Sequence, residues 1–291
     1  MKDFIYLAPT SLQAAVGLLA EHRGKVKVLA GGTDLMLQLQ DGMFAPEYVV
    51  DVKNIPELAT LSFDAQRGLT IGAATPLRKV ETSVIVGEKY PQLATGAGEV
   101  GSVMIRNLAS FGGNICTATP SADGIPALIS LDAVARIASV RGERTVPLAE
   151  FFKGVRQTVL EPDELLVDLR IPAPAAHSSG SYIKLDTRPQ MDLAIVGVAA
   201  TVTLGADGTT IERAVICLGA VATTPIRIPE AEEILKGQTV SDDLLARAGA
   251  AAARAARPIS DVRASADYRR EQCDLVTRRA LRTAIERARA A

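Results

Sequence analysis

The stretch Leu29-Ala-Gly-Gly-Thr-Asp-Leu35 joins an apolar, strand-like run to a glycine pair and then to small polar side chains. A second stretch, Arg106-Asn-Leu-Ala-Ser-Phe-Gly-Gly-Asn-Ile-Cys-Thr-Ala-Thr-Pro-Ser-Ala-Asp123, has the same order of features. Loops of this composition let backbone N–H groups approach a phosphate closely. Two of them in one chain predict a diphosphate held from two sides, and therefore a dinucleotide cofactor. Neither stretch has the spacing of the Rossmann or the P-loop motif, which argues against both of those domains.

Composition excludes several other classes of protein. The chain has 291 residues, 48% of them hydrophobic and 22% charged, with a net charge of −1. These values indicate a globular protein of two or three domains and give no reason to expect a nucleic-acid or anionic membrane partner. The longest apolar runs have the length of a strand, so no membrane span is expected. The N-terminus has no apolar leader, which predicts a cytoplasmic location.

Cysteine and histidine are too few for most metal chemistry. The three cysteines are far apart, and there are only two histidines. A disulfide framework, an iron–sulfur cluster in this chain, a zinc site and a histidine-based triad are therefore all disfavoured. No catalytic residue and no metal ligand is predicted, and any chemistry is expected to come from a bound cofactor.

Periodicity and turn residues predict a region of mixed helices and strands, followed by a meander of strands and then by helices. A helix is expected over Thr10–Glu21 with Ser11 as its N-cap, and Pro172–Ser181 is expected to be a linker or exposed loop. Strands are expected over 25–30, 48–52, 69–73, 134–140, 144–147, 165–171, 181–185, 194–204 and 211–220, and helices over 91–100, 125–132, 228–236, 242–256 and 271–288.

At the two glycine stretches the sequence resembles the FAD-binding (medium) subunit of molybdenum hydroxylases. That family includes xanthine dehydrogenase and aerobic carbon monoxide dehydrogenase. The resemblance covers nearly the whole chain and rests on residues 30–34, on 105–115 with Thr117, Pro120 and Asp123, on Lys184, and on 192–199. It implies an α+β fold, with a two-part FAD-binding region of the vanillyl-alcohol-oxidase type over 1–58 and 59–174. An antiparallel sheet with a helix bundle would follow over 175–291.

The resemblance also implies which residues contact FAD. The two stretches would wrap the diphosphate, Asp123 would bind the ribose or adenosine side, and Leu166 and Lys184 would lie near the isoalloxazine, where the lysine can stabilise negative charge on the reduced ring. The implied contacts are Val28, Leu29, Ala30, Gly31, Gly32, Thr33, Asp34, Ala109, Ser110, Gly112, Gly113, Asn114, Thr117, Asp123, Leu166 and Lys184.

Several of these residues also have a purely structural interpretation. The first glycine pair could be a strand-to-helix turn that Asp34 caps, Asp123 could cap the helix at Ile125, and Lys184 could be an exposed strand residue. An ion pair within a loop is preferred for Arg188 and Asp192. For Cys116, buried packing among small residues is preferred.

The implied function is that of a flavoprotein oxidoreductase in a three-subunit molybdenum hydroxylase. FAD in this chain would accept electrons from two [2Fe–2S] clusters of a small subunit and pass them to an external acceptor. NAD⁺ is slightly disfavoured as that acceptor. A large subunit would hold the molybdopterin cofactor, the whole being a dimer of heterotrimers. No cysteine-rich insertion follows Asp123, which disfavours the 4-hydroxybenzoyl-CoA reductase branch. The alternatives are a stand-alone FAD-dependent oxidase or dehydrogenase of a small alcohol or amine, and a flavin-free scaffold.

Overall fold

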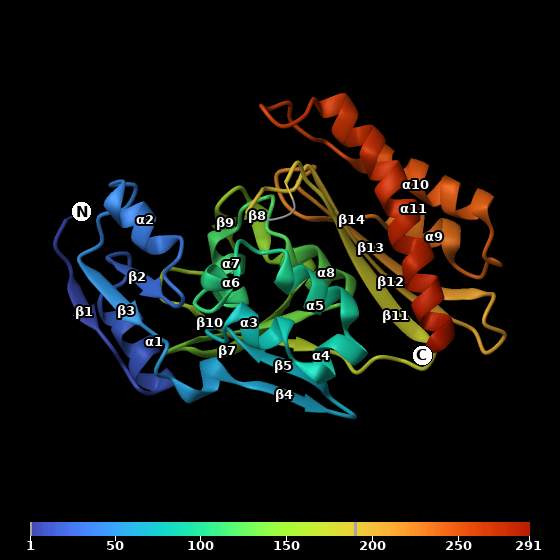
Figure 1. The fold of residues 1–291 in the computed structure, drawn as a ribbon. Coiled ribbons are helices and arrows are strands. Elements are labelled where there is room, and N and C mark those ends of the chain that lie inside the picture. Colours follow the sequence, from blue (N-terminus) through green and yellow to red (C-terminus); the bar gives the residue numbers. More distant parts are fainter. Residues whose placement is uncertain (1, 189–190) are drawn as a thin grey trace.

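Three larger sheets follow one another along the chain in the computed structural model, which describes residues 2–188 and 191–291 (Figure 1). The N-terminal sheet lies on one side of a central part, and the C-terminal sheet with its helices lies on the other (Figure 1). The predicted α+β fold, with a C-terminal antiparallel sheet and helices, is confirmed. The exact divisions at residues 58 and 174 stay a prediction.

The N-terminal sheet is small and parallel, with strand order β1-β3-β2. Parallel neighbours need crossover connections, and two helices supply them. The bounds are Ile5–Leu7 (β1), Leu12–Glu21 (α1), Val26–Leu29 (β2), Leu35–Gln40 (α2) and Tyr48–Asp51 (β3). The first glycine pair therefore follows directly after β2, as predicted.

The central sheet is antiparallel, with strand order β4-β5-β10-β6-β7. Its helices come between β5 and β6, and a two-stranded ribbon comes between β7 and β10. The strand bounds are Leu61–Asp64 (β4), Gly68–Gly72 (β5), Val134–Ser139 (β6), Gly142–Pro147 (β7), Phe152–Gly154 (β8), Gln157–Thr158 (β9) and Leu165–Ile171 (β10). The helix bounds are Leu77–Glu81 (α3), Val84–Lys89 (α4), Pro91–Gly98 (α5), Val103–Arg106 (α6), Phe111–Thr117 (α7) and Gly124–Ser130 (α8), and single 3₁₀ turns occupy Pro56–Ala59 and Leu148–Glu150.

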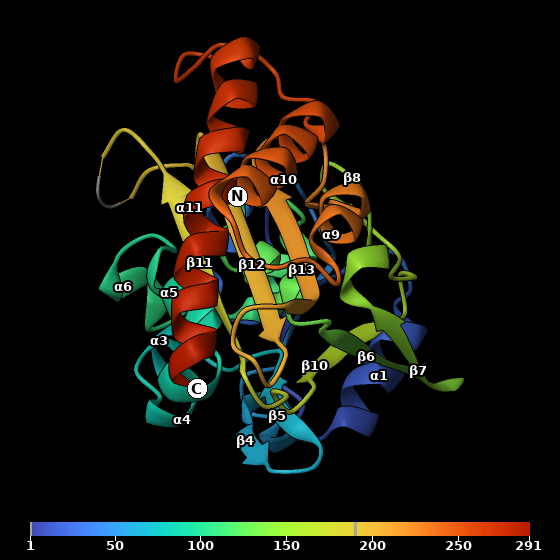
Figure 2. The same cartoon turned by 90° about the vertical axis from the view of Figure 1, so that its right-hand side faces the viewer.

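The C-terminal sheet has strand order β11-β12-β13-β14 and is covered on both faces. Helices α9 to α11 cover one face (Figure 2), and α5 and α8 of the central part pack on the other. The bounds are Ser178–Leu185 (β11), Val196–Leu204 (β12), Ile211–Gly219 (β13), Ile226–Arg227 (β14), Pro229–Leu235 (α9), Asp242–Ala255 (α10) and Ala266–Ala290 (α11). This arrangement explains why β12 is buried along nearly its whole length, with only Thr203 partly exposed, as strands covered on both faces are.

Serine is the N-cap of five helices, and each of the three parts contains at least one of them. In each case the hydroxyl oxygen accepts a hydrogen bond from the backbone N–H three residues later, which satisfies one of the free donors of the first turn. These N-caps are Ser11, Ser102, Ser110, Ser241 and Ser265.

The structure corrects three local predictions. The second glycine pair is in the first turn of α7, because the Ser110 cap lets the helix begin before it. Strand β11 begins at Ser178, inside the expected linker, and α11 begins at Ala266, earlier than expected. Five short strands of two to four residues were not predicted, namely β1, β4, β8, β9 and β14.

Arg269 joins α11 to the C-terminal sheet. Its side chain is 3% exposed and donates to the carbonyl oxygens of Ile195 at 2.7 Å and Ala220 at 3.4 Å, just outside β12 and β13. It also pairs with Asp261 at 2.8 Å. One buried guanidinium thus fixes the start of the helix against two strands.

Replacing Arg269 with alanine should lower the free energy of unfolding by about 3 kcal/mol, because buried acceptors lose a charged donor. Arg270→Ala is the matched control, since Arg270 pairs only with the exposed Asp267 and should change the value by less than about 0.5 kcal/mol. Chemical denaturation followed by circular dichroism measures both variants. Equal effects would contradict the role of Arg269.

Candidate functional site

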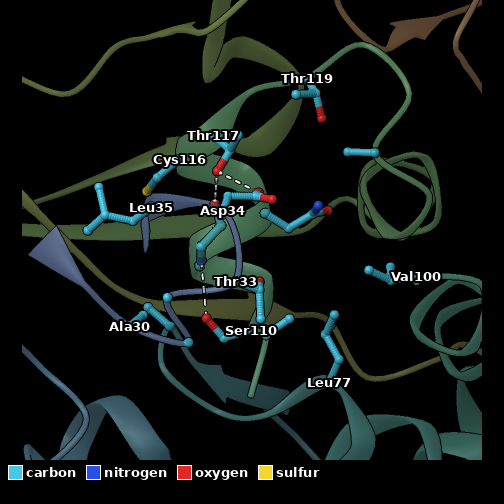
Figure 3. A pocket seen from close by; sticks show the side chains of 18 of the residues that line it. Ala30, Thr33, Asp34, Leu35, Leu77, Val100, Ser110, Cys116, Thr117 and Thr119 are labelled. Atoms are coloured by element: carbon cyan, nitrogen blue, oxygen red, sulfur yellow. Dashed lines mark hydrogen bonds between the residues drawn. The ribbon is translucent and has the colours of Figure 1, made fainter. Parts of the chain in front are cut away.

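A cavity of about 640 Å³ opens between the N-terminal sheet, the central part and residues 191–193 (Figure 3). This volume is typical of a site for a cofactor-sized ligand. All the predicted contact residues line the cavity except Leu29 and Lys184. The structure therefore brings both glycine stretches into one site.

The two stretches touch through their backbones. A Cβ atom on Gly31 would overlap the backbone of Leu108 and Ala109, so only glycine permits this approach. A second link comes from side chains: the Thr117 hydroxyl lies 3.3 Å from the Asp34 carboxylate and donates at 2.8 Å to the Gly113 carbonyl (Figure 3). Asp34 is therefore tied to α7, and it makes no side-chain cap for α2.

The first stretch presents a row of free backbone donors. Within the described part of the chain, the N–H groups of residues 31–35 donate no hydrogen bond. These residues line the cavity, and Gly32 has a φ of +74°, a conformation that glycine adopts readily. Successive unpaired N–H groups form a concave site for an anion.

The second stretch was expected to wrap the diphosphate, but few of its backbone N–H groups are free to do so. Three of its backbone donors are already used: Ala109 donates to the Ile105 carbonyl, Gly112 to the Ala73 carbonyl and Gly113 to the Ser110 hydroxyl. Because Ser110 accepts that bond, its own proton stays available to a ligand. The second stretch thus offers a hydroxyl and open space more than a row of amides.

Two features of α7 indicate a binding site for a ligand. A Cβ atom on Gly113 would meet only the Ser110 hydroxyl oxygen, at 3.5 Å, so the protein itself does not require glycine there. The buried Oδ1 atom of Asn114 has no hydrogen-bond partner among the described residues, although Asn114 lines the cavity. Unpaired buried acceptors are rare in folded proteins unless a ligand or water satisfies them. These features fit a diphosphate with hydroxyl groups beside it.

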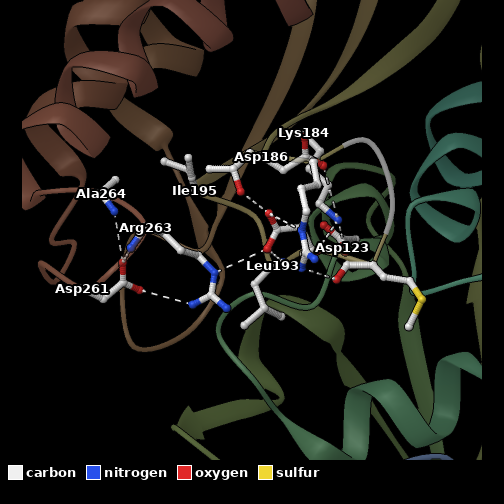
Figure 4. A network of polar contacts seen from close by, with 12 residues as sticks. Asp123, Lys184, Asp186, Leu193, Ile195, Asp261, Arg263 and Ala264 are labelled. Carbon is white, nitrogen blue, oxygen red and sulfur yellow. Dashed lines mark hydrogen bonds and ion pairs between the residues drawn. The ribbon is translucent and has the colours of Figure 1, made fainter.

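A buried polar trio of Asp123, Tyr182 and Lys184 closes the cavity wall next to the C-terminal sheet, and Figure 4 shows Asp123 and Lys184. Asp123 accepts a hydrogen bond from the Tyr182 hydroxyl at 3.0 Å and pairs with the Lys184 ammonium at 3.0 Å. Burial raises the pKa of Asp123 to about 6, although Lys184 and the Tyr182 bond act in the opposite direction. Burial and the neighbouring Asp123 raise the pKa of Tyr182 well above its usual value.

These contacts decide between the structural and functional interpretations of two residues. Asp123 makes no side-chain cap for α8, so the capping interpretation is wrong. The Lys184 side chain is only 2% exposed, so it is not an exposed strand residue. The two side chains are in contact, and of the two only Asp123 lines the cavity. Their places at the ribose and at the flavin ring stay predictions.

Of the remaining structural predictions, the one for Arg188 and Asp192 is confirmed and the one for Cys116 is wrong. Arg188 and Asp192 do form an ion pair, with 3.8 Å between Nε and Oδ2, while Pro189 lies outside the described residues. Asp192 also pairs with Arg263 at 3.5 Å (Figure 4). The hydrogen bond from the Thr187 hydroxyl, together with the Leu193 N–H and the charge of Arg188, lowers the pKa of Asp192 to about 2. Buried packing was predicted for Cys116, but this residue is exposed and lines the cavity.

Comparison with known proteins agrees with this geometry. Residues 2–174 match the family described as the FAD binding domain in molybdopterin dehydrogenase, and residues 181–284 match the CO dehydrogenase flavoprotein C-terminal domain. The chain belongs to the FAD-binding subunits of the molybdopterin dehydrogenase family. It is thus a flavoprotein subunit of the molybdenum hydroxylases, and it contains the FAD-binding domain.

Its relatives differ in the substrates that their names give. It is 32% identical over 247 residues to the nicotinate dehydrogenase FAD-subunit of Eubacterium barkeri, covering 81% of each chain. It is 31% identical to a putative xanthine dehydrogenase FAD-binding subunit of Escherichia coli, covering 99% of this chain and 98% of that one. A solved carbon monoxide dehydrogenase from Hydrogenophaga pseudoflava superimposes with a TM-score of 0.93 at 32% identity and covers 98% of each chain.

Sequence reasoning missed part of the cavity wall. Lys27, Phe44, Val100, Arg156 and Leu193 line it, but none belongs to a glycine stretch. Only Lys27 had a usable signal, because it lies in the strand that leads into the first stretch. None of the helices in residues 2–188 and 191–291 is long and apolar enough to cross a membrane.

Gly113→Val should expel FAD while the C-terminal helices stay folded, because the new side chain fills the open space beside the diphosphate. Gly31→Ala is the comparison variant, and it should lose both stability and FAD because its Cβ atom overlaps the backbone of Leu108. Flavin content per chain and thermal unfolding measure the two effects. Stoichiometric flavin in Gly113→Val would argue against this placement of α7.

FAD affinity should rise with pH. An ionised Asp123 can accept two hydroxyl hydrogen bonds, and its pKa of about 6 means that it is mostly protonated at pH 5. If FAD binds only the ionised form, its dissociation constant should be about tenfold larger at pH 5 than at pH 7. Titrations of wild type and Asp123→Asn test this, and the variant should bind weakly with little change over that range. The facing groups Lys184, Tyr182 and Glu99 are unchanged in it.

Proposed function

We propose that this chain holds FAD as the link between [2Fe–2S] clusters of a partner subunit and an external electron acceptor. FAD can exchange electrons singly or in pairs, which suits it to connect one-electron clusters with a two-electron acceptor. The chain itself supplies binding, orientation and electrostatics. We propose that a large partner subunit holds the molybdopterin cofactor and a small one holds the two clusters, in a dimer of heterotrimers.

The observation that carries the proposal is the row of free N–H groups at residues 31–35, which line the same cavity as the open space at Gly113. No other feature of the cavity requires a glycine at residue 113, whereas a diphosphate lying against α7 does. The Ser110 hydroxyl is placed to donate to the diphosphate, and the Asn114 amide oxygen can accept from a hydroxyl group of the ligand beside it. These groups do no bond chemistry and hold the ligand in position.

The polar trio supports a role for the C-terminal sheet in the same site. Tyr182 and Lys184 keep Asp123 in place, so that a carboxylate remains in a wall from which water is largely excluded. Lys184 also donates to the carbonyl oxygens of Glu99 at 3.3 Å and Asp192 at 2.8 Å. We propose that this lysine sets the charge near the ligand through Asp123.

The substrate of the complex is proposed to be selected by the large partner subunit. Relatives of similar identity to this chain carry names with nicotinate, xanthine and carbon monoxide. The names that describe a subunit or medium chain support assembly into a larger complex. The cytoplasmic location and the external acceptor stay predictions.

The decisive experiment is an absorbance spectrum of the complex purified from its source, followed by chromatography of the released cofactor. One FAD per chain, with iron–sulfur absorbance from co-purifying subunits, is the expected result. FAD in a chain that purifies alone and oxidises a small alcohol or amine would favour the stand-alone enzyme. A colourless chain would instead favour the flavin-free scaffold.

A further inference from the structure

We propose that Arg156, with Lys27, binds the adenosine diphosphate half of FAD and makes this chain select FAD over flavins that lack it. The inference rests on the proposed function and extends it to ligand specificity. Neither residue lies in a glycine stretch, but both line the cavity.

Charge is the first reason. Within the described part of the chain, no carboxylate pairs with Lys27 or Arg156, the two basic side chains that line the cavity. The lining carboxylates are already engaged: Asp123 with Lys184, Glu164 with Arg144, Asp192 with Arg263 and Arg188, and the exposed Asp34 with the Thr117 hydroxyl. Two cations without a carboxylate partner therefore face the cavity, where the exposed Asp34 is the one lining carboxylate of the described residues without a cationic partner, and both cations are available to a group with two negative charges.

The two cations gather at one end of the cavity. The Lys27 ammonium lies 3.8 Å from the centre of the Phe44 ring, and the Arg156 guanidinium contacts the sulfur of Met43. Residues 43 and 44 are neighbours between α2 and β3, in the N-terminal part. Burial lowers the pKa of Lys27, as expected for a cation without a partner carboxylate. A thioether is a weak acceptor, so the guanidinium keeps most of its donors for a ligand.

The cavity wall at Asp123 has a different character. Asp123 lies against the C-terminal sheet, where the Tyr182 hydroxyl of β11 donates to it, whereas the two cations contact residues 43 and 44 of the N-terminal part. The Asp123 carboxylate can accept hydrogen bonds from the hydroxyl groups of a ribityl chain. The cationic end offers charge to the diphosphate and a planar guanidinium that can stack on adenine. This polarity orients a dinucleotide, with its adenosine toward Arg156 and its flavin toward Asp123.

Backbone geometry fixes Arg156 in this position. It lies in the turn between β8 and β9 with a φ of +58°, and its N–H donates at 2.9 Å to the carbonyl of Ala118. Ala118 ends α7 and is itself left-handed, with a φ of +50°. A glycine would adopt these conformations with less strain. Strain kept by a long cationic side chain at a cavity wall points to a function for that side chain.

Titration of the flavin-depleted full chain with FAD and with riboflavin tests the proposal. Arg156→Gln and Lys27→Gln should each weaken FAD binding about 10- to 100-fold, the loss expected for one charged hydrogen bond, and leave riboflavin binding unchanged. ADP should displace FAD from the wild type and do so less well in both variants. Arg67→Gln, in the exposed turn between β4 and β5, is the matched control and should bind like the wild type.

Arg156→Gly separates binding from folding. Because it relieves the left-handed backbone, its apoprotein should unfold at the same temperature as the wild type or higher, yet it should bind FAD as weakly as Arg156→Gln. Equal weakening of FAD and riboflavin in the variants, or unchanged FAD affinity, would overturn the proposal and leave the proposed function intact. A wild-type chain that takes up no flavin at all would overturn both.

Discussion

The site depends on the place where Gly31 lies against the backbone of Leu108 and Ala109. A side chain there would separate the N-terminal sheet from the central part, since the obstacle is backbone that cannot turn aside. Because the two segments meet without one, the free N–H groups of residues 31–35 come opposite α7. Their hydrogen bonds are left for a ligand, which is why the cavity has a chemical preference as well as a shape.

The second requirement is charge held away from water. Asp123 keeps its carboxylate in a buried wall only because Tyr182 and Lys184 reach it from β11. Burial of an isolated carboxylate is unfavourable. The pKa of Asp123 is raised because its contacts with Lys184 and Tyr182 only partly offset the effect of burial. The C-terminal sheet is therefore part of the binding site, although it contributes no glycine stretch and little of the cavity's lining.

Much of the site could be predicted because its chemistry lies in consecutive residues. Glycine pairs flanked by apolar and small polar residues restrict the backbone locally, so both stretches were found. The cationic end could not be found in this way: Lys27 and Arg156 are far apart in the chain, and only tertiary packing brings them to one segment. The helical state of Gly113 was missed for a local reason, since the Ser110 cap outweighs the low helix propensity of two glycines.

The contribution of β11 to the cavity wall also sets an order of events during synthesis. Strand β11 is held by β12 on one side and by α11 across its face, and α11 ends at Ala290. Asp123 emerges from the ribosome long before these supports exist, and domains fold as their own segments become complete. The finished wall can therefore form only after α11 has been made. Loading of the cofactor belongs to the time after that helix has packed on β11.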